Sequence, residues 1–214
     1  MKLNLPTVIP IFPLNGVIYF PETNLPLNIF EPRYLSLIND CMKSNKYIGM
    51  IQSKKNTLGD VYSIGCLGRI IKNKKTKDGR LLINLIGITR FEIKIEINND
   101  KTYREFEVTY DKFKDDLGTV GTLGTQTRGL NKIKEVSEKT KIFFKKNGLL
   151  LNWKEFEKLD ENQRINTLAM IAPISDEEKQ TILESVSAQS KIKVLSQIID
   201  FYMHKSSFEN SSIQ

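Results

Sequence analysis

The side chains that perform most enzyme chemistry are sparse in this sequence. His204 is the only histidine among 214 residues, so neither a histidine-activated nucleophile nor a multi-histidine metal site can be assembled from it. Ser190 and Lys193 have SxxK spacing and would share one face of a helix. A lysine activates a serine only when it is desolvated, however, and the surrounding stretch is polar. A serine–lysine hydrolase is therefore an alternative that we disfavour.

Carboxylates and thiols are the other groups with catalytic potential. Asp115 and Asp116 open a stretch rich in Gly and Thr, which indicates a linker, and residues 176–178 are acidic because they fill a first helical turn, where the helix dipole favours negative charge. Cys41 and Cys66, the only cysteines, can form neither a CxxC redox pair nor a four-ligand zinc set, which indicates buried thiols. We predict no catalytic residue, no metal site and no cofactor.

The net charge of +7 is unevenly distributed. Lysine and arginine outnumber aspartate and glutamate by 17 to 11 in residues 1–112, but only by 15 to 14 in residues 113–214. Much of the excess comes from one basic cluster, formed by Lys72, Lys74, Lys75, Lys77 and Arg80. Such a cluster attracts phosphate or acidic proteins. A solvated hairpin tip is the simpler interpretation, and we prefer it to RNA or DNA binding.

The N-terminal segment does not have the features of a signal peptide. Pro6, Pro10 and Pro13 interrupt it, so it has no continuous apolar region. Elsewhere the sequence contains no apolar run that approaches the roughly 20 residues needed to cross a bilayer. We therefore expect a cytoplasmic protein without a membrane partner.

Short apolar or alternating segments typical of β-strands recur through the first half of the chain: residues 8–12, 25–30, 47–51, 62–71, 81–88, 91–97 and 103–110. Asp78-Gly79 predicts a tight hairpin turn, since glycine tolerates positive φ. Pro32 suits a first helical position, and the apolar residues after it recur every three or four positions. Residues 1–112 should therefore form a mostly antiparallel β domain with one packed helix.

The second half of the chain has a helical pattern. Its Gly/Thr-rich start, residues 113–129, predicts a flexible linker rather than a phosphate loop, because it lacks a Gly-Lys-Ser/Thr ending. Apolar residues then recur at helical spacing from Leu130 up to Gly148, a plausible stop. Capping-box pairs predict three further helix starts: Asn152 with Glu155, Asp160 with Gln163, and Ser175 with Glu178. We predict a helical domain over 130–205 and a flexible tail over 206–214.

Several ordered motifs resemble one known family. The runs IPIFPL (9–14), YFP (19–21) and LPLNIFEPRY (25–34) resemble the opening of the Lon N-terminal, or substrate-binding, domain family, and IFEPRY is the most specific piece. The glycine and arginine positions that follow in the family's order are Gly65, Arg69-Ile70, Asp78-Gly79-Arg80, Gly87 and Arg90-Phe91. Residues 168–184 are similar to the helical half of its short bacterial members.

This resemblance implies an α+β fold: an antiparallel β pseudo-barrel, PUA-like and of Lon N-terminal type, with one packed helix, followed by a C-terminal helical bundle. It also implies largely structural roles for the motif residues. Glu31 would receive helix-terminal amides, Gly65 and Gly87 would occupy tight backbone positions, and arginines would tie loops through carboxylates. These arginines are Arg33, Arg80 and Arg90.

The function that the resemblance implies is non-catalytic. Full-length Lon proteases join this unit to an ATPase and a serine–lysine protease domain, but the present sequence contains no Walker A motif. We expect a protein that binds unfolded or exposed polypeptide segments, with a protease or chaperone as a further partner in protein quality control. The expected contact residues are Phe30, Arg33, Tyr34 and Trp153, between the β domain and the helices, although Trp153 suits a helical core at least as well. The alternatives are a small hydrolase of peptidase S16 type and nucleic-acid binding through the basic hairpin.

Overall fold

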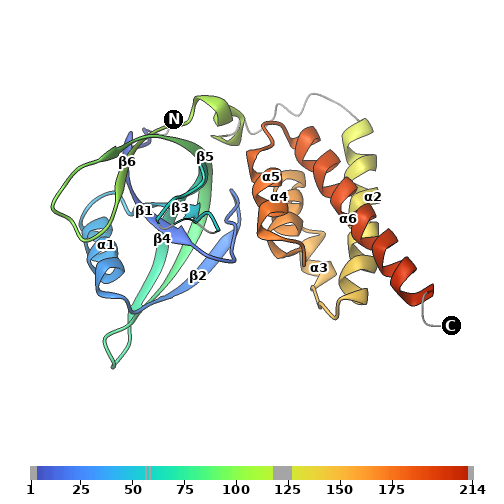
Figure 1. Ribbon diagram of the computed structural model, residues 1–214, viewed down its shortest axis with the longest axis horizontal. Coiled ribbons are helices and arrows are strands. Elements are labelled where there is room, and N and C mark those ends of the chain that lie inside the picture. The colour runs from blue at the N-terminus through green and yellow to red at the C-terminus, as the bar shows by residue number, and fades with distance from the viewer. Residues whose placement is uncertain (1–3, 56, 58, 118–126, 212–214) are drawn as a thin grey trace. The chain divides into compact units, whose positions relative to one another are not determined.

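The computed structural model describes residues 4–55, 57, 59–117 and 127–211 (Figure 1). The chain divides into two compact units, residues 1–119 and 120–214. Most of the predicted linker, residues 118–126, lies outside the described residues. Its first residues, 113–117, belong instead to a short 3-10 helix, η1 (Asp111–Leu117), and its last belong to a long helix that begins at Thr127.

The first unit is built on one six-stranded sheet with the order β2-β5-β4-β3-β1-β6. The strands are β1 (Val8–Leu14), β2 (Asn24–Ile29), β3 (Tyr47–Gln52), β4 (Ile64–Lys75), β5 (Leu81–Ile97) and β6 (Glu105–Thr109). An additional pairing of β5 with β6 closes five of them into a ring, from which β2 extends as an end strand (Figure 1). The β1–β3 pair is parallel and the other pairs are antiparallel, so the sheet is mixed. The expected α+β class with a β pseudo-barrel is confirmed, apart from this parallel pair.

Ring closure depends on the length of β5. Residues 81–88 and 91–97, predicted as two strands, form one 17-residue strand. Its first part pairs with β2 and its last part with β6 on the same side, while β4 follows the other side. The change of partner takes place between Ile86 and Glu92. Within this stretch, an added Cβ at Gly87 would lie 2.3 Å from the Phe20 carbonyl oxygen. The expected tight backbone position of Gly87 is confirmed.

The core of the first unit has two layers of apolar side chains. The barrel interior is filled by one cluster: Ile9, Ile11, Tyr47, Ile51, Leu67, Phe91, Phe106 and Val108. At Gly65 an added Cβ would lie 2.5 Å from the Met50 carbonyl oxygen, so only glycine fits this approach of two strands. The helix α1 (Pro32–Lys43) begins at Pro32 as predicted and buries one face, formed by Tyr34, Leu37, Ile38 and Cys41.

The second unit is helical, with α2 (Thr127–Lys146), α3 (Trp153–Phe156), α4 (Glu161–Ile171), α5 (Asp176–Glu184) and α6 (Ala188–Ser211). The side chains of Asn152, Asp160 and Ser175 each accept the predicted backbone amide, and the last two form complete capping boxes. The long helices α2 and α6 pack side by side (Figure 1). The helix α6 continues to Ser211, within the range predicted as a tail, whose last residues, 212–214, lie outside the described residues.

Candidate functional site: the start of α1

Three of the expected contact residues lie together where β2 leads into α1. Phe30 follows the last residue of β2, and 65% of its surface is exposed. The Tyr34 ring is buried and stacks on Phe12 of β1, with ring centroids 4.0 Å apart and an angle of 24° between the planes. The Arg33 guanidinium lies over the Tyr34 ring, 4.5 Å from the ring centroid. We name Phe30, Arg33 and Tyr34 the α1 patch.

A short ion pair orients the charged part of the α1 patch. The Arg33 Nε donates to Glu31 Oε2 at 3.0 Å, and its Nη2 lies 2.9 Å from the same oxygen. Glu31 was expected to receive helix-terminal amides, and it does so without a hydrogen bond to its side chain. The helix-terminal amides of Tyr34 and Leu35 bond to the Glu31 backbone carbonyl instead. The Glu31 carboxylate is thereby available to hold Arg33 over the ring.

The pKa of Tyr34 is raised, mainly by burial, while the Arg33 charge lowers it and the Glu31 charge raises it. The phenol therefore stays neutral at physiological pH. The α1 patch offers a ligand an exposed apolar ring and an exposed cation, which lie beside a buried, stacked aromatic pair. These are the means by which proteins hold apolar and acidic side chains without reacting with them.

The strand that precedes the α1 patch has an open edge. Among the described residues, β2 pairs with β5 alone. Pro26 has no N–H to donate, so its backbone must face away from β5. Because successive backbone groups of a strand point to opposite edges, Asn24 and Asn28 also face outward. The edge offers two N–H donors and three carbonyl acceptors, which is enough to pair with a short extended segment.

Trp153, the fourth expected contact residue, belongs to the second unit and not to the α1 patch. It begins α3 and is half-buried. Its ring centroid lies 6.1 Å from that of Phe144 and 5.3 Å from that of Phe156, and the Lys141 Nζ lies 5.1 Å from the ring centroid. These contacts give Trp153 a packing role within the helices.

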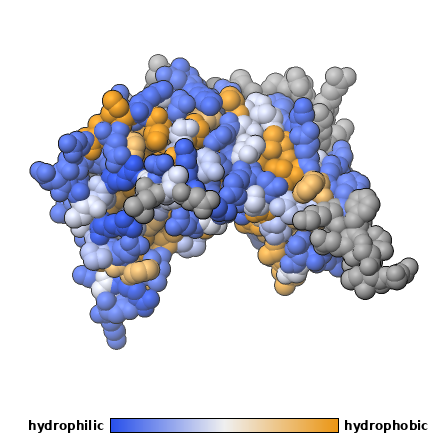
Figure 2. Space-filling model, viewed as in Figure 1, coloured by the Kyte–Doolittle hydropathy of each residue, from blue (hydrophilic) through white to orange (hydrophobic). Residues whose placement is uncertain are grey.

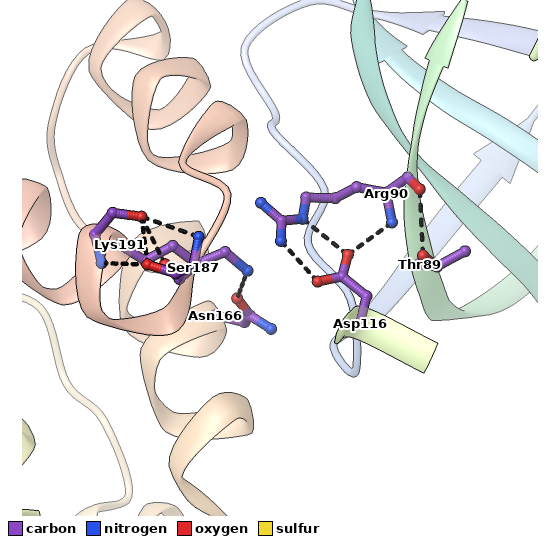
Figure 3. Close-up of polar contacts among 7 residues, drawn as sticks. Thr89, Arg90, Asp116, Asn166, Ser187 and Lys191 are labelled. Atoms are coloured by element: carbon purple, nitrogen blue, oxygen red, sulfur yellow. Dashed lines mark hydrogen bonds and ion pairs between the residues drawn. The ribbon is translucent and has the colours of Figure 1, made fainter. Parts of the chain in front are cut away.

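Sequence reasoning missed the carboxylate partner of Arg90. The Asp116 Oδ2 accepts from the Arg90 backbone N–H at 2.9 Å and from its Nε at 2.8 Å, and Oδ1 accepts from Nη2 at 2.7 Å (Figure 3). The Arg90 guanidinium also lies 4.1 Å from the Phe113 ring centroid. Arg90 was expected to tie a loop through a carboxylate, which is confirmed, but Asp116 was assigned to a linker. Its position in η1 corrects that assignment.

The geometry of Ser190 does not match that of an activated nucleophile. Its hydroxyl donates to the Ser187 carbonyl at 2.7 Å and accepts from the Ser187 N–H at 3.0 Å, while the Ser190 N–H donates to the Ser187 hydroxyl at 3.1 Å. These bonds cap the first turn of α6. The Lys193 side chain is exposed, whereas a lysine that activates a serine has to be desolvated. Ser190 therefore has a structural role in this arrangement.

The two cysteines are buried and free, as expected. The Cys41 thiol donates to the Tyr47 carbonyl at 3.3 Å, and burial, reinforced by the charges of Asp40 and Glu105, raises its pKa to about 12. A thiol with this pKa is almost entirely protonated at neutral pH and is a poor nucleophile. Within the described residues there is no group of three or more His, Cys, Asp or Glu side chains that could hold a metal ion. No helix among them is long and apolar enough to span a bilayer.

Comparison with known proteins agrees with this fold. Residues 8–200 match the family described as the ATP-dependent protease La (LON) substrate-binding domain. The Lon protease of Dictyoglomus thermophilum is 25% identical over 194 residues, which are 89% of this chain and 24% of that protein. The Lon protease of Elusimicrobium minutum is 32% identical over 101 residues, 44% of this chain and 12% of that protein. The chain thus spans about a quarter of the length of the first of these relatives.

Two solved structures share the fold. A Lon N-terminal domain protein from Xanthomonas campestris superposes with a TM-score of 0.66 at 19% identity, covering 89% of this chain and 97% of that one. The N-terminal domain of Mycobacterium avium complex Lon protease gives a TM-score of 0.67 at 14% identity and covers 90% and 98%. Both matches cover almost the whole of the solved domain.

Proposed function

Because this chain belongs to the LON substrate-binding domain family, we propose that it binds exposed segments of unfolded polypeptides at the α1 patch and the neighbouring edge of β2. The observation that carries the proposal is the 65% exposure of Phe30 beside an end strand. An apolar side chain of the ligand would cover Phe30, and its main chain would pair with β2.

The expected affinity is modest. Burying an aromatic side chain contributes about 1.5–3 kcal/mol, and each new main-chain hydrogen bond contributes a net of about 0.5–1.5 kcal/mol. Association and ordering of a flexible ligand offset much of this sum. A dissociation constant on the order of micromolar is therefore reasonable, which would allow release of the segment after capture.

A binding experiment with a matched pair of variants tests the proposal. Fluorescence anisotropy of a labelled unfolded polypeptide, such as reduced and carboxymethylated α-lactalbumin, would be measured with the wild type and with Phe30→Ala. Phe201→Ala is the control, because Phe201 is 60% exposed and lies in the second unit. Loss of the burial of one ring predicts at least tenfold weaker binding for Phe30→Ala, and no change for the control. Equal affinity of all three proteins would contradict the proposal.

We also propose that captured segments are passed to a separate protease or chaperone in the cytoplasm. The support is the family's description as a substrate-binding part of an ATP-dependent protease. Affinity capture from native cells followed by mass spectrometry should recover such a partner with the wild type and less of it with Phe30→Ala. Cleavage of unfolded casein by the purified chain, abolished in Ser190→Ala, would instead establish the hydrolase alternative.

A further inference from the structure

The β4–β5 hairpin carries a second surface that the proposed function does not use. It projects from the barrel as the long loop between β4 and β5 in Figure 1. Its turn is well fixed, since the Thr76 N–H donates to the Arg80 carbonyl at 2.9 Å, and the Gly79 N–H donates to the Thr76 carbonyl at 3.1 Å, with φ of +89° at Gly79. The hairpin is therefore an ordered element.

The charge of this hairpin is strongly positive. Residues 69–80 contain six basic side chains and one acidic side chain. The single acid, Asp78, is bound by Arg80, whose Nε donates to it at 2.7 Å, and this interaction, with the Thr76 hydroxyl, lowers the pKa of Asp78 to about 2. The remaining basic side chains of the tip are all exposed: Lys72, Lys74, Lys75 and Lys77. Figure 2 shows the projecting tip as a hydrophilic surface.

In the part of β4 that carries these lysines, one edge of the strand has no neighbouring strand among the described residues. The last printed pair between β3 and β4 joins Tyr47 to Arg69, and the Ile70 N–H donates to the Lys46 carbonyl. Beyond that point, residues 72–75 pair with β5 alone among the described residues. The Thr76 N–H points to β5, so by strand alternation the backbone groups of the residues at 73 and 75 face the open side.

Side chains on this hairpin alternate in the same regular way. Lys72 and Lys74, two residues apart, project from one face of β4, opposite Asn84 and Leu82 of β5. Lys75 projects from the other face. A strand added to the open edge would place every second side chain beside Lys72 and Lys74. The charges therefore complement an extended segment with a carboxylate at every second position.

We propose that the open edge of β4 binds acidic polypeptide segments in extended conformation, by main-chain pairing at Asn73 and Lys75 and by the charges of the four exposed lysines. Nucleic acid suits this surface less well, because residues 64–85 contain no aromatic side chain on which a base could stack. The inference does not rest on the proposed function, since it concerns other residues and another ligand.

The test uses short labelled peptides and a matched pair of quadruple variants. An eight-residue Glu-Val repeat should bind the wild type with an affinity that falls as salt is raised. The variant Lys72→Gln, Lys74→Gln, Lys75→Gln, Lys77→Gln should bind it at least tenfold more weakly. The control variant removes the same charge from exposed lysines of the second unit: Lys145→Gln, Lys146→Gln, Lys154→Gln, Lys158→Gln. Unchanged binding by the hairpin variant, or an equal loss in both variants, would overturn the proposal.

A second peptide separates main-chain pairing from attraction by charge alone. A Glu-Val repeat that is methylated at every backbone nitrogen has the same charge as the Glu-Val repeat but has no N–H groups, so it cannot form a β-ladder. It should bind at least fivefold more weakly than the Glu-Val repeat. Equal binding of the two peptides, or tighter binding of a single-stranded RNA with the same number of charges, would refute pairing with an acidic strand. The loss of affinity caused by the four hairpin substitutions should be the same in the wild-type and Phe30→Ala backgrounds, because the open edge of β4 does not include Phe30.

Discussion

Replacing Asp116 by alanine should destabilise the first unit more than any other single loss of charge in it. Asp116 accepts three hydrogen bonds from Arg90, one of them from the backbone, at 2.7–2.9 Å. The exposed fraction of the side chain is 1% for Arg90 and 8% for Asp116. The substitution therefore takes the carboxylate away from a guanidinium that water does not reach. It also weakens the attachment of η1 to β5, which then depends on the buried Phe113 ring beneath the Arg90 guanidinium.

The magnitude follows from the burial of the pair. Removing one partner of a buried ion pair costs about 3–5 kcal/mol, because the remaining charge loses its compensation. For a unit of about 120 residues, each kcal/mol lowers the melting temperature by about 4 °C, so the expected decrease is about 12–20 °C. Most mutations cost less than this, which makes the effect easy to distinguish.

Asp115→Ala is the matched control, since it removes the same charge one residue earlier from an exposed position. Melting would be followed by far-ultraviolet circular dichroism, and hydrogen exchange read by mass spectrometry would show where protection is lost. Peptides from β5 and η1 should exchange faster in Asp116→Ala than in the control. If the two variants melt at the same temperature, the Arg90–Asp116 pair does not hold η1 to the barrel and the argument fails.

Three further predictions concern the backbone, the helix caps and alkaline pH. Gly87→Ala should cost about 1–3 kcal/mol in urea unfolding, since its Cβ would lie 2.3 Å from the Phe20 carbonyl oxygen; a neutral result would contradict the tight approach. Ser175→Ala should cost about 1 kcal/mol by the same assay, through loss of the α5 cap, and no loss would mean that the cap is dispensable. Burial raises the pKa of both Tyr103 and Cys41 to about 12, so the folded state holds these protons more tightly than the unfolded state does. The contribution of these two groups to the free energy of unfolding should therefore be complete below about pH 9 and fade toward pH 12. Tyr103→Phe should flatten this fall in the unfolding free energy between pH 9 and 11, and an unchanged slope would refute the assignment.

Features set by neighbouring residues could be predicted from the sequence. The caps at Asp160 and Ser175 were identified correctly because the capping residues are three positions apart. The start of α1 at Pro32 and the hairpin turn at Gly79 are equally local. The exposure of Phe30 depends on the folded unit as a whole. Phe30 was named as a contact residue only because a family motif includes it.

Features set by distant residues could not be predicted in this way. Asp116 lies 26 positions from Arg90, and in the sequence its neighbours are those of a linker. The continuity of β5 was missed because Thr89 and Arg90 interrupt the apolar pattern, although both are buried in the folded unit. The buried polar pair Arg90–Asp116 accounts for that interruption. The parallel pairing of β1 with β3 was missed for a related reason, since alternation within a strand carries no information on the direction of its partner.

The α1 patch combines a buried aromatic ring, Tyr34, with an exposed one, Phe30, and this arrangement favours its proposed role in binding. Phe12 comes from a barrel strand and Tyr34 from the buried face of α1, so the stacked pair is part of the core. Arg33 is held over that pair by Glu31. A ligand that covers Phe30 therefore meets groups that are already ordered, and the entropy lost on binding falls mainly on the ligand. Since Phe30 itself contributes little to the core, its replacement should weaken binding without unfolding the protein, which separates the function of this patch from the stability of the fold.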